Sequence, residues 1–398
     1  MSPLLNPDLL AADPSESWPV YAEDEIAAVA SILRSGRVNQ WTGPDVFAFE
    51  TACQKAFGGG HGIALANGSV ALELALRAFG IGQKDEVVVS PRSFVASASC
   101  VVLVGATPVF ADVDCSSGNL TPQAIEAVLT DRTRAIVVVH LGGWPADMPA
   151  IVDLARARGI KVIEDCAQAH GARIEGRSVG SFGDAATFSF CQDKIISTGG
   201  EGGFVSFRDH AAYEWAWSYK DHGKVREKAC APATDHGTFR WVHDSVGTNW
   251  RMTGLQAAIG LAQLQKLPDW SATRARNAAI WADGLSGVPN LRAPLPRAGV
   301  DHAFYKFYAY VDAPGEQAAV LRAEIFRRSA AAGLRVFSGS CSEIYREKAF
   351  ADLAVEPLPN AHLLGESSLM VEVHPTLDPE RLKRRAEALA SIARDVLS

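Results

Sequence analysis

Lys194 lies in a sequence pattern that could place a reactive amine beside a flat ligand. In FSFCQDKIISTGGEGG, residues 188–203, it follows a short aromatic strand pattern and precedes glycine pairs at 199–200 and 202–203. A lysine on a glycine-rich loop is most often a solvated turn residue. Glycines, however, let a backbone run close to a planar molecule, and a lysine in a partly dry pocket becomes an amine nucleophile. The chemical hypothesis is a Schiff base between Lys194 and an aldehyde cofactor.

Asp165 offers a complementary group. It ends an apolar strand pattern in IEDCAQAHGA, residues 163–172. A helix N-cap or a satisfied ion pair is the commoner role for such an aspartate. Its carboxylate could instead face the ring nitrogen of pyridoxal 5′-phosphate (PLP) and keep it protonated, so that the ring accepts electrons from a carbanion. Lysine for the aldehyde and aspartate for the ring nitrogen serve one cofactor.

Two further stretches fit the same cofactor. Asn67, Gly68 and Ser69 begin a helix pattern in ANGSVALELAL, residues 66–76. The free N–H groups and the dipole of a helix start attract an anion such as a phosphate, although an N-G-S start is most often plain capping. Phe94, in SPRSFVASAS, is either a core residue or an aromatic ring that stacks on the cofactor.

Alternating strand and helix patterns predict the scaffold that holds these residues. Apolar residues at helical spacing predict a helix over 24–36, and Thr121 with Pro122 predicts the start of another. Short β-branched runs predict strands at 87–89, 108–110, 135–139 and 161–163. This alternation is typical of an α/β fold with a doubly wound, mainly parallel sheet.

Polar residues follow several of these strands, at the edge where open α/β sheets bind ligands. Each has an ordinary structural interpretation on its own. Taken together they outline one pocket, and they are Ser90, His140, Glu164, Asp165 and the segment 189–194.

A change of pattern after about Leu261 predicts a second, smaller α+β domain. Proline and arginine become frequent, and the strand pattern at 304–311 precedes a helical pattern at 320–333. We therefore predict a large domain over 1–260, which binds the cofactor and begins with an N-terminal arm of about twenty residues. The small C-terminal domain covers 261–398.

Composition narrows the class of partner. The formal net charge of −7 and the pI near 5.8 give no basic surface for nucleic acid. Seven scattered cysteines without C-x-x-C or metal-ligand spacing predict no metal site and fit a reducing cytoplasm. The N-terminus lacks a signal-peptide pattern, and the apolar stretch 95–110 reads as a buried helix, turn and strand, so no membrane association is expected.

Several motifs in a fixed order now resemble one family over nearly the whole chain. They are WTGPDVFAFE, ALANGSVALELAL, VFADVD, AIVVVHLGGWPADM, VIEDCAQAHGA, FSFCQDKIISTGGEGG and VGTNWRMTGLQAAIGLAQL. The chain is similar to the DegT/DnrJ/EryC1/StrS family of PLP-dependent sugar aminotransferases. This resemblance implies the aspartate-aminotransferase-like fold (fold type I), with a mainly parallel seven-stranded sheet and a smaller C-terminal domain.

The resemblance also implies roles for single residues. Lys194 matches the Schiff-base lysine, Asp165 the partner of the pyridine nitrogen, and Gln168 a neighbour that hydrogen-bonds the cofactor's ring oxygen. Some relatives carry histidine at the lysine position and act as dehydratases, so Lys194 favours transamination. The remaining cofactor positions are Gly68, Ser69, Val70 and Ser189 for the phosphate and Phe94 for stacking.

Asn249 matches an asparagine that reaches the phosphate of the partner subunit's cofactor. That match implies a homodimer with shared active sites. The implied reaction is ping-pong, with glutamate as amino donor and Lys194 as the base that moves the proton. The implied acceptor is a nucleotide-linked 4-keto-6-deoxy sugar for cell-surface polysaccharide or natural-product biosynthesis, because STGGEGG resembles members that aminate carbon 4.

Alternatives remain open at this point. The cofactor motifs do not exclude a C3-keto sugar, a cyclitol ketone or an elimination reaction. A non-catalytic PLP-binding sensor is a further alternative, although no basic patch or DNA-binding appendage is apparent.

Substrate contacts transfer less completely from the resemblance. The stretch 337–345 departs from the usual tyrosine–proline–leucine–histidine pattern, so its two aromatic residues are open between substrate contact and core packing. A lysine stands at 220 where relatives often have arginine, which keeps the charge but not the bidentate fork. The candidates for substrate contact are Thr42, Lys220, His222, Arg251, Phe337 and Tyr345.

Overall fold

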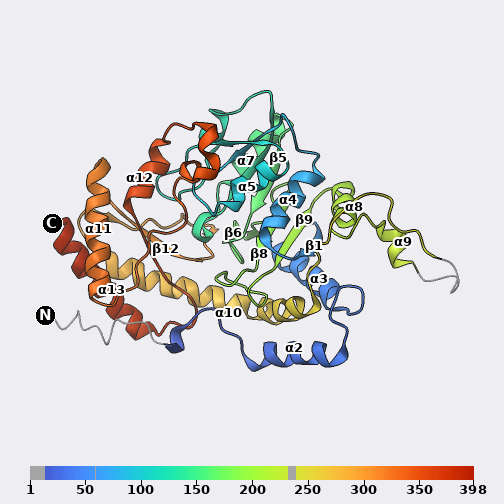
Figure 1. Cartoon of the computed structure of the whole chain (residues 1–398). Helices are drawn as coiled ribbons and strands as arrows, with labels where there is room; N and C mark the ends of the chain where they lie inside the picture. Colours follow the sequence, from blue (N-terminus) through green and yellow to red (C-terminus); the bar gives the residue numbers. More distant parts are fainter. Residues whose placement is uncertain (1–13, 59, 232–238) are drawn as a thin grey trace.

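The computed structural model describes residues 14–58, 60–231 and 239–398, and a seven-stranded sheet lies at its centre (Figure 1). In sheet order its strands are β1 (His61–Leu65), β9 (Gly203–Phe207), β8 (Ala185–Ser189), β5 (Lys161–Asp165), β4 (Thr133–Val139), β2 (Glu86–Val89) and β3 (Thr107–Phe110). Within this sheet β9 is antiparallel to β1 and β8, while all other neighbours pair in parallel. The predicted doubly wound, mainly parallel sheet is confirmed.

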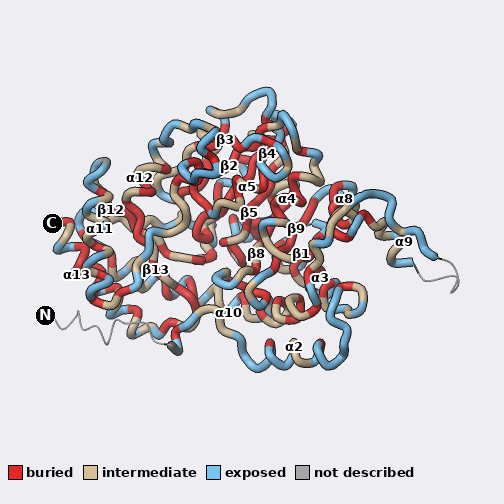
Figure 2. The backbone as a smooth tube through the Cα atoms, in the orientation of Figure 1, coloured by how far each residue is buried: buried red, intermediate tan, exposed pale blue. Residues whose placement is uncertain are grey.

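Helices cover both faces of this sheet. The helices up to residue 230 are α2 (Glu23–Ser35), α3 (Asp45–Phe57), α4 (Gly68–Ala78), α5 (Ala96–Leu103), α6 (Pro122–Glu126), α7 (Met148–Ala157), α8 (His210–Tyr219) and α9 (Arg226–Cys230). Helices α4, α5 and α8 share a core with Val137 and Ile163 on one face, whereas α6 and α7 share a core with Val138 and Val162 on the other. Successive strand residues therefore point to opposite faces, as the pleat requires. The buried core is concentrated around the sheet (Figure 2).

A single long helix, α10 (Gly254–Leu285), runs from the helices beside the large sheet to the C-terminal part of the chain. It packs against α2 and α3 at one end and against the last helix, α13 (Pro379–Leu397), at the other (Figure 1). Its capping box is formed by Thr253 and Gln256, which fixes where the helix begins. Residue 261, where we predicted a domain boundary, lies inside α10. The division at that residue stays a prediction.

The C-terminal part has its own antiparallel sheet and core. The sheet is formed by β10 (Leu291–Arg292), β12 (Phe307–Val311) and β13 (Ser368–Val371). Helices α11 (Gly315–Ala331), α12 (Pro359–Ser367) and α13 surround it, with short 3₁₀ helices η4 (Ile344–Arg346) and η5 (Lys348–Leu353). A third small sheet pairs β6 (Arg173–Ile174) with β7 (Arg177–Ser178) and β11 (Val300–Asp301). The strand and helix predicted at 304–311 and 320–333 thus correspond to β12 and α11.

The described N-terminal segment contacts first the C-terminal helix α13 and then the loop after β8 that carries Lys194. It begins with η2 (Pro14–Glu16), where buried Glu16 pairs with Arg385 at 2.6 Å. Further along, the indole N–H of Trp18 donates to the backbone oxygen of Lys194 at 2.9 Å, and the Tyr21 hydroxyl pairs with Ser197 Oγ at 3.1 Å. The rest of the predicted arm, residues 1–13, lies outside the described residues.

The apolar stretch 95–110 forms α5, a turn and β3, as predicted. Among the described residues, no helix is both long enough and apolar enough to cross a bilayer.

Candidate active site

A cavity of about 870 Å³ opens at the carboxyl edge of the large sheet, against the C-terminal part. The large sheet contributes the ends of β4, β5 and β8, and the C-terminal part contributes segments 305–306, 335–341 and 370–372. A volume of this size suits a cofactor together with a substrate. The predicted residues that line it are Gly68, Ser69, Val70, Phe94, Asp165, Gln168, Ser189, Lys194 and Phe337.

The Lys194 side chain is mostly shielded, with 12% of it exposed. Its Nζ lies 3.9 Å from Asp193 Oδ1 and 4.9 Å from the centre of the Tyr305 ring. Its backbone is held from both sides, because the Lys194 N–H donates to Cys191 O and its carbonyl accepts from Trp18. The amine is thus presented to the cavity from a fixed backbone.

Asp193 and Tyr305 form a pair beside this lysine, in which the tyrosine hydroxyl donates to the carboxylate. Burial opposes the charged form of Asp193, but the Lys194 ammonium and the Tyr305 hydrogen bond outweigh it and lower the pKa of Asp193. Burial, followed by the charge of Asp193, raises the pKa of Tyr305. The pair therefore consists of an ionised aspartate and a neutral phenol.

Asp165 is 5% exposed and is oriented by two donors. Ser97 Oγ, on α5, donates to Asp165 Oδ2 at 2.8 Å, and the Ala167 N–H donates to Oδ1 at 3.2 Å. Ser97 Oγ also lies 2.9 Å from Ser93 Oγ. A carboxylate accepts about four hydrogen bonds, so Asp165 retains acceptor positions on the cavity side.

The start of α4 lies against the end of β8. Asn67 caps the helix by accepting from the Val70 N–H at 3.0 Å. A Cβ added to Gly68 would lie 2.6 Å from Ser189 Cβ, so only glycine lets the helix start come this close to the strand. The result is a helix N-terminus with Ser69 and Ser189 at the cavity wall. This donor set fits a phosphate.

Two other predicted cofactor neighbours also line the cavity. Gln168 Oε1 accepts from the Gly142 N–H at 2.7 Å, and Gln168 Nε2 lies 3.4 Å from Ser340 Oγ. Phe94 is 64% exposed, so the core interpretation of this residue is wrong. An exposed ring on a cavity wall is available for stacking.

The glycines after Lys194 require a correction, because they pack against protein atoms. A Cβ on Gly202 would lie 1.9 Å from Thr198 Oγ1, and one on Gly203 would lie 2.2 Å from Asn67 O. Gly199 and Gly200 have φ angles of 80° and 108°, which favour glycine. Glycine is therefore needed to turn the loop and to start β9 beside α4.

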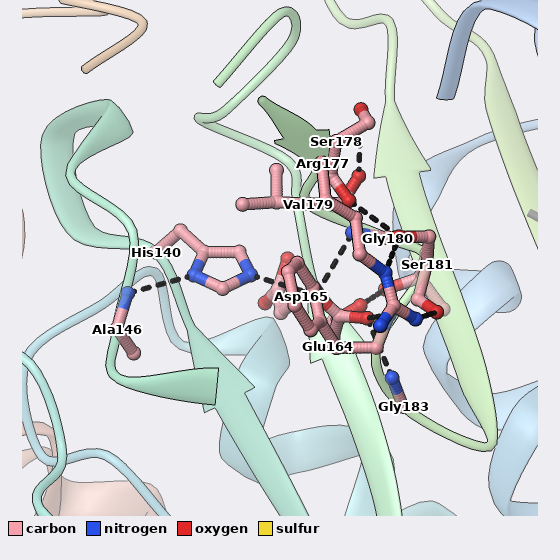
Figure 3. Close-up of polar contacts among 12 residues, drawn as sticks. His140, Ala146, Glu164, Asp165, Arg177, Ser178, Val179, Gly180, Ser181 and Gly183 are labelled. Carbon is pink, nitrogen blue, oxygen red and sulfur yellow. Dashed lines mark hydrogen bonds and ion pairs between the residues drawn. The ribbon is translucent and has the colours of Figure 1, made fainter. Parts of the chain in front are cut away.

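His140 and Glu164, which sequence placed at the pocket, form a buried network instead (Figure 3). Glu164 Oε1 accepts from the N–H groups of Phe182 and Gly183, both at 2.7 Å. Its Oε2 accepts from the Gly180 N–H at 2.8 Å and from His140 Nε2 at 3.3 Å. His140 Nδ1 accepts from Ala146 N–H, so the ring proton is on Nε2.

His140, Glu164 and Cys166 lie close enough together to suggest a metal site. Both oxygens of Glu164 and both ring nitrogens of His140 are already used in hydrogen bonds. Burial raises the pKa of the Cys166 thiol well above its ordinary value, which disfavours the thiolate that binds metals. The cluster has the chemistry of a structural network.

Five predicted residues gather outside this cavity, around Asp221. Asp221 pairs with Arg251, accepts from the Trp41 indole at 2.8 Å and forms a β-bridge with Asn249. Fully buried Lys220 donates to Gln40 Oε1 at 2.6 Å, and burial lowers its pKa to about 8. The predicted residues in this cluster are Lys220, His222, Asn249 and Arg251. The fifth, Thr42, follows Trp41 in the chain and hydrogen-bonds Asn39.

Tyr345 lies in the core. It is 6% exposed, packs against Phe110 and donates to Glu343 at 2.5 Å. This placement fits the packing interpretation and gives no support to a substrate contact.

Sequence reasoning missed several residues that line or support the cavity. No local pattern marks them, because they are single polar residues on ordinary strand and helix patterns. They are Ser97, Tyr305, Lys306, Arg335, Ser340 and Glu372.

Comparison with known proteins identifies the family. The sequence model of the DegT/DnrJ/EryC1/StrS aminotransferase family matches residues 19–390. The chain belongs to this family. It is a PLP-dependent aminotransferase of fold type I, and the resemblance in sequence is confirmed.

Individual relatives cover most of the chain. The UDP-N-acetyl-3-dehydro-alpha-D-glucosamine 3-aminotransferase of Acidithiobacillus ferrooxidans is 38% identical over 348 residues, 86% of this chain and 87% of the relative. The GDP-perosamine synthase of Caulobacter vibrioides is 35% identical over 350 residues, 87% of this chain and 90% of the relative. The X-ray structure of an aminotransferase from Psychrobacter cryohalolentis matches with a TM-score of 0.90 and 45% identity, covering 96% of this chain and 99% of that one.

Proposed function

We propose that this aminotransferase transfers an amino group from glutamate to the keto carbon of a nucleotide-linked sugar. The observation that supports it is one cavity lined by Lys194, Asp165 and the N-terminus of α4. These groups meet the separate demands of an aldehyde, a ring nitrogen and a phosphate. The relatives described above are named for nucleotide-linked sugars, which supports the class of acceptor.

Each of the protein's side chains in the cavity has a separate role in the proposed reaction. When bound, PLP supplies an electron sink for the carbanion at the reacting carbon. Lys194 Nζ would hold the cofactor aldehyde and would act as the base that moves a proton between the substrate carbon and the cofactor carbon. Asp165, oriented by Ser97, would keep the ring nitrogen protonated. Phe94 would stack on the ring, and Gln168 would donate to its oxygen.

The phosphate would be held at the start of α4. Ser69 and Ser189 offer hydroxyl donors there, and Gly68 offers a backbone N–H group. Val70 lines the same wall, and its own N–H group donates to Asn67. Apart from Asn249, the residues that sequence assigned to the cofactor all line this cavity, and the proposal retains those assignments.

The position of amination has two candidates. The sequence after Lys194 favours carbon 4 of a 4-keto-6-deoxy sugar, whereas the Acidithiobacillus relative is named as a 3-aminotransferase. Matched 3-keto and 4-keto nucleotide sugars, assayed with glutamate, separate them. A cyclitol ketone belongs in the same assay as the alternative acceptor.

We further propose a cytoplasmic homodimer. Asn249 and Arg251 lie in the cluster around Asp221, outside the cavity of their own chain. Residues in that position can serve a second subunit's site, which supports the shared active site. The seven cysteines are free thiols, as suits a reducing compartment.

Lys194→Ala tests the proposal. The variant should lose the near-visible absorption band of the lysine-bound cofactor, and turnover should fall by at least about 10³-fold. Adding glutamate to the wild-type protein should deplete that band. A wild-type protein with full PLP occupancy and no such band would contradict the role of Lys194.

The alternative that the protein is a PLP-binding sensor predicts a different response to amino donors. A non-catalytic PLP-binding protein would show the band but no change on addition of glutamate or of any other amino donor. Amination of a keto sugar by the wild-type protein excludes that alternative.

A further inference from the structure

The cavity contains three cationic side chains, and they differ in how they are neutralised. Lys194 Nζ lies 3.9 Å from Asp193, and Arg335 Nη2 lies 3.3 Å from Glu372. Lys306 also lines the cavity. Within residues 14–58, 60–231 and 239–398, its ammonium has neither an ion pair nor a hydrogen-bond acceptor. It lies over the Tyr305 ring, with Nζ 5.3 Å from the ring centre.

Lys306 is held firmly where it stands. It directly precedes β12, and its backbone N–H donates to Gly142 O at 3.3 Å, next to the Gly142 N–H that binds Gln168. Its side chain is half-buried. Burial lowers the pKa of Lys306, although the carboxylates of Glu372 and Asp193 act in the opposite direction. A half-buried ammonium without a partner is destabilising, and an anion in contact would relieve that cost.

The position of Lys306 relative to Lys194 limits where such an anion lies. The two Nζ atoms are 4.9 and 5.3 Å from the centre of the same Tyr305 ring. Because both ammonium groups lie beside this ring and line one cavity, an anion on Lys306 lies in the part of the cavity that Lys194 also lines. It is also distinct from the phosphate site at the start of α4, which is formed by Ser69 and Ser189.

We infer that Lys306 binds an oxyanion of the substrate in the aminotransferase reaction, a carboxylate of the amino donor or a phosphate of the nucleotide-linked acceptor. This inference rests on the proposed function. Arg335 also lines the cavity but is paired with Glu372, so Lys306 is the cation that has no carboxylate partner of its own among the described residues. Lys306 lines the same cavity as Phe337, whereas Tyr345, the other aromatic candidate from the stretch 337–345, does not line it.

Calorimetric titration of the PLP-loaded protein tests the inference without turnover. The probes are glutarate, which carries the two carboxylates of the donor but no amine, and UDP and GDP, which carry the phosphates of the acceptor. Lys306→Met keeps the chain length and removes the charge. We expect the dissociation constant of one class of probe to rise roughly ten- to hundredfold, with partial recovery in Lys306→Arg.

The two classes of probe show whether the oxyanion belongs to the amino donor or to the acceptor. Weaker binding of glutarate alone assigns Lys306 to the donor, and weaker binding of UDP or GDP alone assigns it to the acceptor. Lys383→Met, on the exposed face of α13, is the matched control and should bind both probes as the wild type does. Equal dissociation constants for wild type and Lys306→Met, or no binding of either probe to the wild type, would overturn the inference.

Failure of the proposed function is separately visible. In that case the wild-type protein would not aminate keto sugars, whatever its affinity for the probes. The cofactor band and the unfolding midpoint of Lys306→Met should match those of the wild type, which shows that the substitution acts on the ligand and not on the fold.

Discussion

Glu164 and Asp165 are neighbours on β5, yet the fold uses them in opposite ways. Glu164 points to the face covered by α6 and α7, where four donors occupy its two oxygens (Figure 3). Asp165 points to the face of α4 and α5, where two donors orient it and part of its acceptor capacity faces the cavity. A saturated carboxylate is structural, whereas a partly satisfied one is available for chemistry.

Asp165→Asn should give the largest effect and should leave the fold intact. The amide retains an oxygen that can accept from Ala167, but it no longer holds a negative charge toward the cofactor's ring nitrogen. We expect turnover to fall on the order of 10³-fold, with the unfolding midpoint close to that of the wild type. Steady-state kinetics and thermal unfolding of one preparation measure both. A variant with wild-type turnover would remove Asp165 from the mechanism.

Glu164→Gln should show the reverse. The amide nitrogen would face two of the four donors, so buried N–H groups would lose their acceptor. We expect the free energy of unfolding to fall by about 3 kcal/mol, with turnover per folded molecule nearly unchanged. Urea unfolding at equal protein concentrations measures the change.

Glu380→Gln is the control for that experiment, because this exposed carboxylate pairs with Lys383 on the surface of α13. It should leave stability unchanged. If Glu164→Gln is as stable as this control, the network around Glu164 is not what holds the loop at residues 180–183.

Ser97→Ala should have the smallest effect, because it changes only a donor to Asp165. It removes one of the two donors that orient Asp165 and leaves the carboxylate in place. A charge-assisted hydrogen bond of this kind corresponds to about tenfold in kcat/KM. Ser97→Thr, which keeps the hydroxyl, should recover most of the activity. Equal kcat/KM for wild type and alanine variant would show that Asp165 needs no second donor.

The sequence could predict the sheet and most of the cavity because both depend on local patterns. β-branched runs marked β2 to β5, and Lys194, Asp165 and the start of α4 stand in continuous motifs. Strands β1 and β9 were missed, because one follows glycines and the other is a short run directly after the glycine loop. The face of the sheet to which a side chain points is harder to predict than the strand itself. Glu164 was expected at the pocket but points to the opposite face.

Residues brought in by distant elements could not be predicted. Ser97 reaches Asp165 from α5, and Tyr305 reaches Asp193 across more than one hundred residues. Lys306 stands in FYKFYAYV, where any lysine beside a strand would be taken as solvated. Tertiary packing decides which of these polar groups is left without a partner.

The short contact between Trp18 and Lys194 has a practical consequence for handling the protein. A shortened form that starts after Tyr21 would lose the indole that holds the lysine carbonyl, the Tyr21 link to Ser197 and the Glu16 attachment to Arg385. Trimming this end to improve expression or crystallisation would therefore alter the active lysine's support.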